Sequence, residues 1–376
     1  MKLIRTTTVP QTLNTFCKGL LKELKHEGYE VVAVSSPGEE LEELANSEGI
    51  RTIALPMERR ISPFKDLKSL FQMWRVLRRE KPDMVHSMTP KAGMVTMVAA
   101  WLARVPIRIH TFTGLVFPTS TGLKRRILMF TDWLTCACAT YIIPEGEGVK
   151  ADLLKNKITK KDIQVLGHGN IRGIDLEYFK PGAPRLQEEQ APFSFVFVGR
   201  LVGDKGINEL IEAFSRLNKE HSATRLVLVG PEEEEIDPIK PETKVEIDRN
   251  PAIDAVGQQS DVRSFFATAN ALVFPSYREG FPNVVIEAGA MGLPSIVTDI
   301  NGSREIIIDG ENGMIVPSKN AEALYHAMKH FVENPEDVKR MAENARPLIA
   351  SRYEQSYVRQ CLKDFYKECI ASISKE

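Results

Sequence analysis

Two cations stand five positions apart in the second half of the chain, in a setting suited to holding negative charge. Arg200 and Lys205 lie in the stretch Val198–Gly206, where glycines bend the chain directly after an apolar run. An arginine presents a planar fork of donors and a lysine a compact charge, so the pair can neutralise a diphosphate. A solvated loop between a strand and a helix would carry the same residues, so this pattern alone leaves both interpretations open.

A second candidate site contains two glutamates with seven residues between them. A helix is predicted to begin near Pro282, because proline suits the first helical turn. The N–H groups of that turn can hold phosphate oxygens, and Gly280 allows a close approach of the backbone. Glu279 precedes the helix, and Glu287 lies two turns into it among apolar residues, where a carboxylate needs a partner. We expect Glu279 at the sugar end of a bound nucleotide sugar and Glu287 on its ribose hydroxyls; two surface glutamates on a helix are the alternative.

Both candidate sites follow short apolar runs, and such runs alternate with helical patterns along the whole chain. In the first half the predicted strands are Lys2–Arg5, Glu30–Ser35, Arg51–Leu55, Met84–Ser87, Ile107–Thr111, Tyr141–Ile143 and Ile163–Leu166. In the second half they are Phe193–Val198, Arg225–Val229, Ala271–Phe274, Ser295–Thr298 and Met314–Val316. This alternation predicts an α/β fold, with parallel sheets that carry helices on both faces.

The length and a break in the pattern predict two domains. A chain of 376 residues is too long for one ordinary core, and the alternation stops in the proline-rich, polar stretch 179–190. We therefore expect an N-terminal Rossmann-like domain at 1–182, a linker at 183–192, a C-terminal Rossmann-like domain at 193–352 and a final helix at 353–376 that returns to the first domain. Two doubly wound domains would face a cleft, and ligands bind such sheets at the carboxyl ends of the strands.

The composition excludes several classes of protein. The formal net charge of -1 argues against nucleic-acid binding through bulk charge. The five cysteines form no C-x-x-C repeat, which is typical of a reduced, cytoplasmic chain without a zinc site. No signal peptide is recognisable, and no run of about 18 apolar residues predicts a membrane-spanning helix.

The candidate sites together resemble a known family. The stretch Arg278–Glu287 resembles the E-x7-E motif of the large family of retaining GT-B glycosyltransferases numbered four. The loop Gly199–Gly206 is similar to the donor-phosphate loop of that family, and Ala290–Gly313 also fits its pattern. His86–Gly93 and Gly173–Asp175 look like stretches common in the members that build bacterial surface polysaccharides.

This resemblance implies a function and a role for each site residue. Arg200 and Lys205 would bind the donor diphosphate and stabilise its charge as it departs, Glu279 would contact the donor sugar and Glu287 the ribose. Backbone groups would complete the pocket at Gly280, Phe281 and Asn283. The implied enzyme moves a hexosyl or N-acetylhexosaminyl group, with retention, from a UDP-sugar to a glycan or lipid-linked acceptor. The nucleotide sugar is a substrate, no cofactor is expected, and no metal is expected because the chain contains no Asp-x-Asp.

The first half departs from the family pattern at two places. Thr6–Thr12 stands where the family has a glycine-rich loop, and Thr113 stands where it has a histidine before Gly114. The resemblance implies that the N-terminal domain at 1–182 binds the acceptor and that the C-terminal domain at 193–352 binds the donor. These two departures leave the residue that assists on the acceptor side unassigned. His110 points to the other face of its strand from Thr113, and we expect it to be a buried structural histidine.

The segment Gly122–Leu134 predicts a contact with the membrane. It is helical in pattern, basic at its start and aromatic further on, and Leu67–Arg79 ends in a similar basic run. Basic amphipathic helices can rest on anionic membrane surfaces, so we expect a cytoplasmic protein at the inner face of the membrane. A surface helix packed on its own sheet is the alternative.

Other functions compete with glycosyl transfer. A UDP-sugar 2-epimerase shares the two-domain architecture, although the two glutamates argue against it, and a non-catalytic nucleotide-sugar-binding protein would share the donor site. A dinucleotide-dependent oxidoreductase is disfavoured, because no G-x-G-x-x-G follows the first strand.

Overall fold

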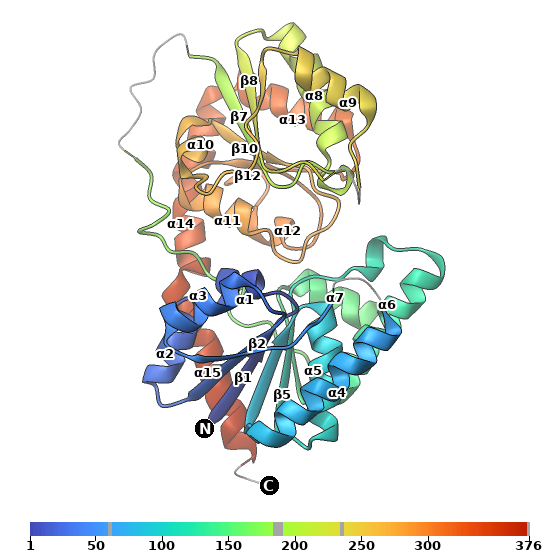
Figure 1. Cartoon of the computed structure of the whole chain (residues 1–376). Helices are drawn as coiled ribbons and strands as arrows, with labels where there is room; N and C mark the ends of the chain where they lie inside the picture. The colour runs from blue at the N-terminus through green and yellow to red at the C-terminus, as the bar shows by residue number, and fades with distance from the viewer. Residues whose placement is uncertain (59–61, 183–190, 234–236, 374–376) are drawn as a thin grey trace. The chain divides into compact units, whose positions relative to one another are not determined.

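The computed structural model describes residues 1–58, 62–182, 191–233 and 237–373. The chain forms two compact units (Figure 1). Unit 1 consists of Met1–Gly173 together with Ser356–Glu376, and unit 2 is Ile174–Gln355. The division after Gly173 precedes the predicted boundary at 182, and most of the predicted linker, 183–190, lies outside the described residues.

Unit 1 is built on a six-stranded parallel sheet. Its strands are β1 (Lys2–Thr6), β2 (Glu30–Ser35), β3 (Arg51–Ala54), β4 (Met84–Met88), β5 (Ile107–Phe112) and β6 (Tyr141–Pro144). They lie in the order β3-β2-β1-β4-β5-β6. The strand order reverses between β1 and β4, and such a switch point is where open α/β sheets bind ligands.

Helices cover both faces of this sheet, and each face has its own core. One core contains α1 (Pro10–Cys17), α2 (Leu20–His26), α3 (Glu39–Glu48) and α15 (Gln355–Ile373). The other contains α4 (Pro63–Glu80), α5 (Pro90–Leu102), α6 (Gly122–Cys138) and α7 (Glu147–Lys155), and a short 3-10 helix, η1 (Phe117–Thr119), also contributes to it. Neighbouring strand residues alternate between the two cores: Leu3 packs into the first and Ile4 into the second. Both faces are apolar, which explains the continuous apolar runs in the sequence.

Unit 2 repeats the same topology. Its strands are β7 (Phe193–Val198), β8 (Thr224–Val229), β9 (Ile253–Ala255), β10 (Ala271–Phe274), β11 (Ser295–Thr298) and β12 (Gly313–Val316), in the order β12-β11-β10-β7-β8-β9. Its helical segments are η2 (Gly203–Lys205), α8 (Ile207–Glu220), α9 (Pro241–Arg249), α10 (Arg263–Thr268), α11 (Asn283–Ala290), α12 (Ser303–Ile306), α13 (Ala321–Glu333) and α14 (Pro335–Tyr353). The switch point lies between β7 and β10, and the prediction of two doubly wound parallel sheets is confirmed.

A few predicted elements were wrong. Residues 163–166 form no strand: Ile163 and Leu166 are buried in opposite cores of unit 1, so this segment passes the sheet without joining it. The sequence of Thr12–His26 has a continuous amphipathic pattern typical of one helix, but the structure has two helices there, because the chain turns at Lys18 and Gly19. In unit 2 the short strand β9 and the helices α9, α12 and α14 were not predicted.

The last helix, α15, belongs to unit 1 and covers a buried arginine. The guanidinium of Arg5 donates to the Tyr366 hydroxyl at 2.7 Å, and it also contacts His86 and Cys17. His86 is bonded in turn to the Thr111 hydroxyl at 2.7 Å, and burial, followed by the charge of Arg5, holds the pKa of His86 well below its ordinary value. In the described part of the chain the partners of the Arg5 guanidinium are the Tyr366 hydroxyl, the His86 ring and the sulfur atoms of Cys17 and Met88.

Candidate active site and its family

The two predicted loops of unit 2 meet at its switch point. They leave the adjacent parallel strands β7 and β10 at their carboxyl ends, and hydrogen bonds join them directly. The amide of Tyr277 donates to the carbonyl of Asp204 at 2.8 Å, and the Arg278 guanidinium pairs with the Asp204 carboxylate at 2.9 Å. Two segments far apart in the sequence therefore form one surface.

Two glycines allow the loops to pack backbone against backbone. Gly206 has a φ of +72°, and a Cβ there would lie 2.2 Å from the carbonyl oxygen of Pro275. Gly302, with a φ of +74°, would place a Cβ 2.6 Å from the carbonyl oxygen of Gly280. Because any side chain would force these segments apart, both positions require glycine. Gly302 thereby brings the loop after β11 against the start of α11.

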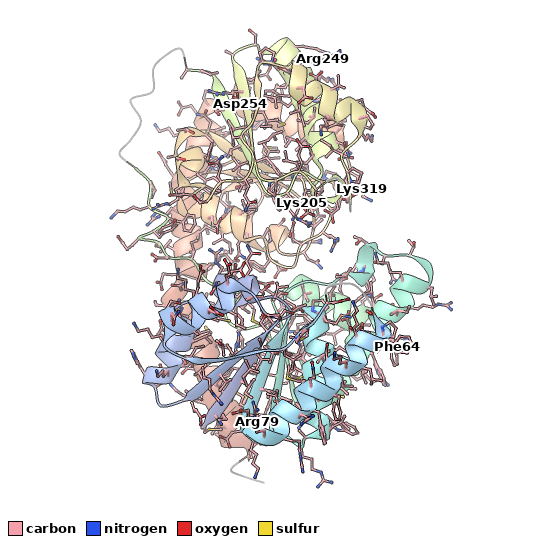
Figure 2. The ribbon with its side chains drawn as sticks, viewed as in Figure 1. Phe64, Arg79, Lys205, Arg249, Asp254 and Lys319 are labelled. Atoms are coloured by element: carbon pink, nitrogen blue, oxygen red, sulfur yellow. The ribbon has the colours of Figure 1, made fainter. Side chains whose placement is uncertain are left out.

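Lys205 and Glu279 form an ion pair at the centre of this surface. Their side chains are only 17% and 18% exposed, and the Ser276 hydroxyl donates to the same Glu279 oxygen at 2.7 Å. The Lys205 ammonium also lies 5.3 Å from the centre of the Phe274 ring. Figure 2 shows Lys205 at the edge of unit 2 where these loops gather. The structure thus brings together one predicted phosphate ligand and the predicted sugar ligand.

Arg200 stands in a different setting. It forms an ion pair with Glu233 at 2.5 Å, and both side chains are more than a third exposed. An exposed pair of this kind contributes little to stability and exchanges partners readily. Arg200 is therefore at the predicted loop but pairs with the acidic segment after β8.

The helix α11 supplies backbone groups and the second glutamate. It begins at Asn283 with Pro282 as its N-cap, one residue later than predicted. Glu287 lies in its second turn and is half-buried. The ring of Phe281 is buried and packs edge-on against Tyr353, with 5.5 Å between ring centres. The Phe281 side chain is therefore part of the packing of unit 2, and the role of its backbone at the donor site stays a prediction.

Two further residues at this surface were not predicted. The Tyr277 hydroxyl donates to Glu209 at 2.6 Å, and burial followed by this carboxylate raises the pKa of Tyr277. The Lys319 ammonium lies 4.8 Å from the centre of the Tyr277 ring. Tyr277 directly precedes the stretch Arg278–Glu287, so its place beside this motif was a signal for it as a candidate site residue. Lys319 follows β12, which lies two strands from β10 in the sheet. Its approach to Tyr277 depends on this strand order, which the sequence alone does not reveal.

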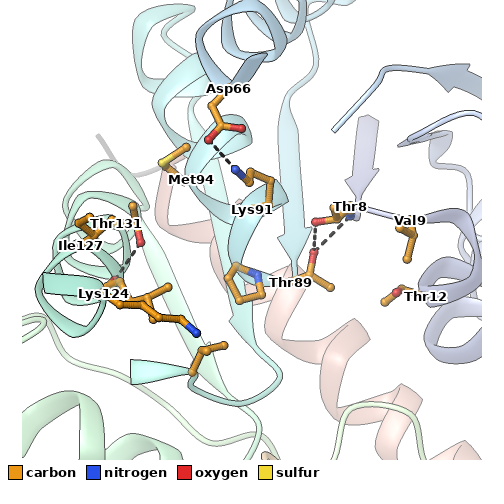
Figure 3. A pocket seen from close by; sticks show the side chains of 13 residues that line it. Thr8, Val9, Thr12, Asp66, Thr89, Lys91, Met94, Lys124, Ile127 and Thr131 are labelled. Carbon is orange, nitrogen blue, oxygen red and sulfur yellow. Dashed lines mark hydrogen bonds and ion pairs between the residues drawn. The ribbon is translucent and has the colours of Figure 1, made fainter. Parts of the chain in front are cut away.

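Unit 1 has a pocket of about 630 Å³ beside its own switch point (Figure 3). Its polar lining residues are Thr8, Thr12, Asp66, Thr89, Lys91, Lys124 and Thr131. Its apolar lining residues are Val9, Pro90, Met94, Val116, Ile127 and Leu128. The lining comes from the segments after β1 and β4, from α1, α4, α5 and α6, and from Val116 before η1. Thr8 and Thr12 stand after the first strand, where the family pattern has a glycine-rich loop.

Thr89 is held in a strained conformation at this pocket. Its φ of +70° and ψ of 145° lie in a region that β-branched residues rarely adopt. Its hydroxyl accepts from the amide of Thr8 at 3.2 Å and is bonded to the Thr8 hydroxyl at 2.8 Å. Such strain costs on the order of 1–3 kcal/mol and concentrates at functional sites.

His110 is enclosed in the core of unit 1, as predicted. Its Nδ1 is bonded to the Ser87 hydroxyl at 2.8 Å, and burial lowers its pKa to about 3. The ring also fills the space beside Gly93, where a Cβ would lie 2.3 Å from it. The His110 imidazole is neutral and buried among core side chains, so it stabilises the fold of unit 1.

The described ranges contain neither a candidate metal site nor a membrane-spanning helix. No group of three or more histidine, cysteine, aspartate or glutamate side chains in them is arranged to hold a metal ion. No helix among these residues is long and apolar enough to cross a bilayer.

Comparisons with known proteins identify the class of protein. Residues 12–169 match the family model described as glycosyl transferase 4-like domain, and residues 183–347 match glycosyl transferases group 1. Solved structures share the fold over the whole chain. A structure of Anabaena Alr3699/HepE in complex with UDP has a TM-score of 0.79 at 16% identity, covering 98% of this chain and 100% of that one. Two units of this kind, each with this strand order, define the GT-B fold of glycosyltransferases.

Sequence relatives place the chain within that class. The capsular polysaccharide biosynthesis glycosyltransferase CapM of Staphylococcus aureus is 32% identical over 371 residues, which covers 97% of this chain and 96% of the relative. A galactosyltransferase of Escherichia coli, named for GlcNAc-diphosphoundecaprenol, is 26% identical over 86% of both chains. The chain belongs to the glycosyltransferase family that combines a glycosyl transferase 4-like domain with a glycosyl transferases group 1 domain. The prediction of a glycosyltransferase is therefore confirmed.

Proposed function

We propose that this glycosyltransferase moves a sugar from a UDP-sugar to a lipid-linked glycan acceptor during bacterial polysaccharide assembly, with retention at the anomeric carbon. The relatives support the biological setting, because one is named for capsular polysaccharide and another for a diphosphoundecaprenol acceptor. A hexosyl or N-acetylhexosaminyl group fits the galactosyl- and N-acetylgalactosaminyltransferases among them. The UDP bound in a structure of the same fold supports the choice of base.

The Lys205–Glu279 ion pair at the switch point of unit 2 is the observation that supports the donor site best. It lies beside the start of α11, where backbone N–H groups favour anions. In the proposed complex the Lys205 ammonium turns from Glu279 to the donor diphosphate. Glu279, released from the lysine, accepts hydrogen bonds from the hydroxyls of the donor sugar.

Arg200 supplies, with Lys205, the positive charge that binds the donor diphosphate. Its present partner, Glu233, is exposed, so exchanging that carboxylate for a diphosphate costs little. Glu287, in the second turn of α11, takes the ribose hydroxyls, and the backbone at Gly280, Phe281 and Asn283 lines the pocket. These roles follow the resemblance of the two loops to the family motif.

The proposed chemistry needs charge stabilisation more than a protein nucleophile. The bond between the anomeric carbon and the diphosphate oxygen breaks, and the acceptor hydroxyl forms its new bond on the same face. Its proton passes to the departing phosphate oxygen, which lies on that face. Lys205, Arg200 and the start of α11 stabilise the negative charge that develops, the kind of contribution that often dominates such catalysis.

We place the enzyme at the inner face of the membrane, where a lipid-linked acceptor would be found. The outward face of α6 supports this placement: Phe130 and Trp133 are exposed and stack on each other, and Arg126 lies on the same face. Aromatic and basic residues together suit a membrane interface. Membership of the family weighs against a 2-epimerase and against a non-catalytic binding protein.

Thermal shifts with nucleotides test the donor assignment directly. Binding to the folded state raises the unfolding temperature, so UDP and UDP-sugars should stabilise the protein more than GDP, ADP and their sugars. A transfer assay with radiolabelled UDP-sugars then separates transfer from binding. Equal shifts with all the nucleotides would contradict the choice of UDP.

A further inference from the structure

We propose that the pocket of unit 1 binds the junction between phosphate and lipid in the acceptor, with Lys124 as the contact to the phosphate. This inference rests on the proposed function, since it assigns the acceptor's chemical class to particular residues. The ligand would be an amphiphile, with a phosphate beside an apolar chain. The charge of the pocket, its strained hydroxyl pair and the apolar residues at its mouth support the assignment.

The charge of the lining favours an anion. The lining contains two cations and one carboxylate, and Lys91 is paired with Asp66 inside the pocket. Both members of that pair are largely buried, so they neutralise each other. Lys124 remains, exposed in the first turn of α6, and no ion pair involves it within the described ranges. Figure 3 shows its side chain directed away from α6. A mobile ammonium is well suited to a phosphate.

The strained threonine supplies hydroxyl groups to the same space. Thr8 and Thr89 come from the ends of β1 and β4, and the Thr89 conformation keeps their hydroxyls 2.8 Å apart (Figure 3). The Thr8 hydroxyl also accepts from the amide of Ala92 at the start of α5. Glycine would adopt this conformation without strain, but it would lack the hydroxyl that bonds to Thr8.

The apolar side of the pocket continues onto the surface at its mouth. Ile127 lines the interior from α6, and Leu123, one turn earlier on that helix, is 73% exposed. On α4, the lining residue Asp66 has two exposed apolar residues close to it in sequence, Phe64 and Leu67, which are 90% and 64% exposed. Figure 2 shows Phe64 at the outer end of α4. Neighbouring exposed apolar residues of this kind indicate a surface that is covered in use.

A lipid-linked phosphate matches both parts of this surface. The phosphate lies between Lys124 and the threonine hydroxyls, and the first segment of the chain follows Ile127 toward Leu123. A water-soluble sugar would leave the apolar rim exposed, and a neutral lipid would leave the lysine without an anion. The membrane-facing residues of α6 continue on the same helix, which provides a route for the lipid from the bilayer.

The test compares Lys124→Gln with a matched control, Lys155→Gln, in the full-length enzyme. Lys155 is an exposed lysine at the end of α7 in the same unit and does not line the pocket. Two acceptors carry the same sugar, one on a lipid diphosphate and one on an uncharged octyl glycoside. Lys124→Gln should raise the KM for the lipid diphosphate roughly tenfold to a hundredfold, as expected for a lost charge-assisted contact. The KM for the UDP-sugar and turnover of the octyl glycoside should stay unchanged.

Three results would overturn the inference. The first is an equal rise in the KM for the lipid diphosphate with Lys124→Gln and Lys155→Gln. The second is an equal loss of transfer by Lys124→Gln to the lipid diphosphate and to the octyl glycoside. The third is strong competition by vesicles of anionic phospholipid, which would show that the pocket takes ordinary lipid headgroups. An additional variant, Ile127→Ser, should weaken acceptors with longer chains more than short ones. If the wild-type enzyme neither binds UDP nor transfers its sugar, the proposed function itself fails, which is distinguishable from loss at Lys124 alone.

Discussion

Lys205 and Glu279 are 74 positions apart in the sequence and form an ion pair in which both side chains are largely buried. Each comes from the loop that follows one of the two central strands of unit 2. The carboxylate holds the lysine beside the segment that leads into α11. A donor diphosphate would replace the carboxylate as the partner of the lysine, and the released Glu279 carboxylate would then rely on the Ser276 hydroxyl and on the proposed sugar hydroxyls for its hydrogen bonds.

The first prediction concerns this lysine. Lys205→Ala should lower kcat/KM for the sugar donor by roughly a hundredfold or more, because a preorganised charge contact to the leaving group is lost. Arg200→Ala should act in the same direction. Lys219→Ala, on the exposed end of α8, is the control and should retain wild-type kinetics. Near-normal turnover in both site variants would refute the assignment of the phosphate side.

The second prediction separates the two glutamates. Glu287→Gln should weaken binding of free UDP and of UDP-sugar alike, by roughly tenfold to a hundredfold, since bonds from the ribose hydroxyls to a carboxylate are lost. Glu279→Gln should leave UDP affinity within a few-fold and damage sugar transfer. Calorimetry with UDP and a transfer assay measure the two effects. Reversed effects would mean that the donor lies in the opposite orientation.

The third prediction concerns metal ions. Transfer should continue in excess EDTA, because cationic side chains and a helix start are proposed to carry the charge of the diphosphate. The measurement is the initial rate before and after dialysis against the chelator. A loss of activity that magnesium or manganese restores would reveal a metal site that neither the sequence pattern nor the described residues indicate.

The fourth prediction concerns Asp132, which is buried in α6. Burial raises its pKa to about 7. Between about pH 4 and pH 7 the folded state therefore binds more protons at this site than the unfolded state does, and stability falls as the pH rises through that window. Asp132→Asn removes the ionisation. Its stability relative to wild type should thus increase from pH 5 to pH 8, by a few kcal/mol as an order of magnitude.

Thermal unfolding across this pH range measures the effect. Asp162→Asn, an exposed site in the same unit, serves as the control and should follow the wild-type curve. Parallel curves for wild type and Asp132→Asn would show that Asp132 stays ionised in the folded state.

The fold was largely predictable because both sheets are buried on two faces. Strands such as Phe193–Val198 and Ser295–Thr298 contain consecutive buried apolar residues, and their predicted bounds match the structure. The segment 163–166 was misassigned for the same reason, since an apolar run that serves two cores looks like a buried strand. Hydrophobic patterning indicates burial, but it does not indicate whether a neighbouring strand is available for pairing.

The site was predictable where its residues are close in sequence. Glu279, Gly280 and the start of α11 lie in one stretch, so their arrangement could be foreseen. The pairing of Arg200 with Glu233, and the approach of Lys319 to Tyr277, depend on how separate loops are placed by the strand order. The strained Thr89 likewise could not be read from its residue type, because threonine rarely adopts that conformation.

The hydrogen bond between Arg5 and Tyr366 has a consequence for the order in which the chain matures. Unit 2 lies entirely between the two segments of unit 1, so all of its strands leave the ribosome before α15 does. Until α15 arrives, the buried Arg5 guanidinium lacks Tyr366, and one core of unit 1 remains uncovered. The domain that is synthesised first is therefore the one that completes its folding last, and during translation it depends on a segment that has not yet been made.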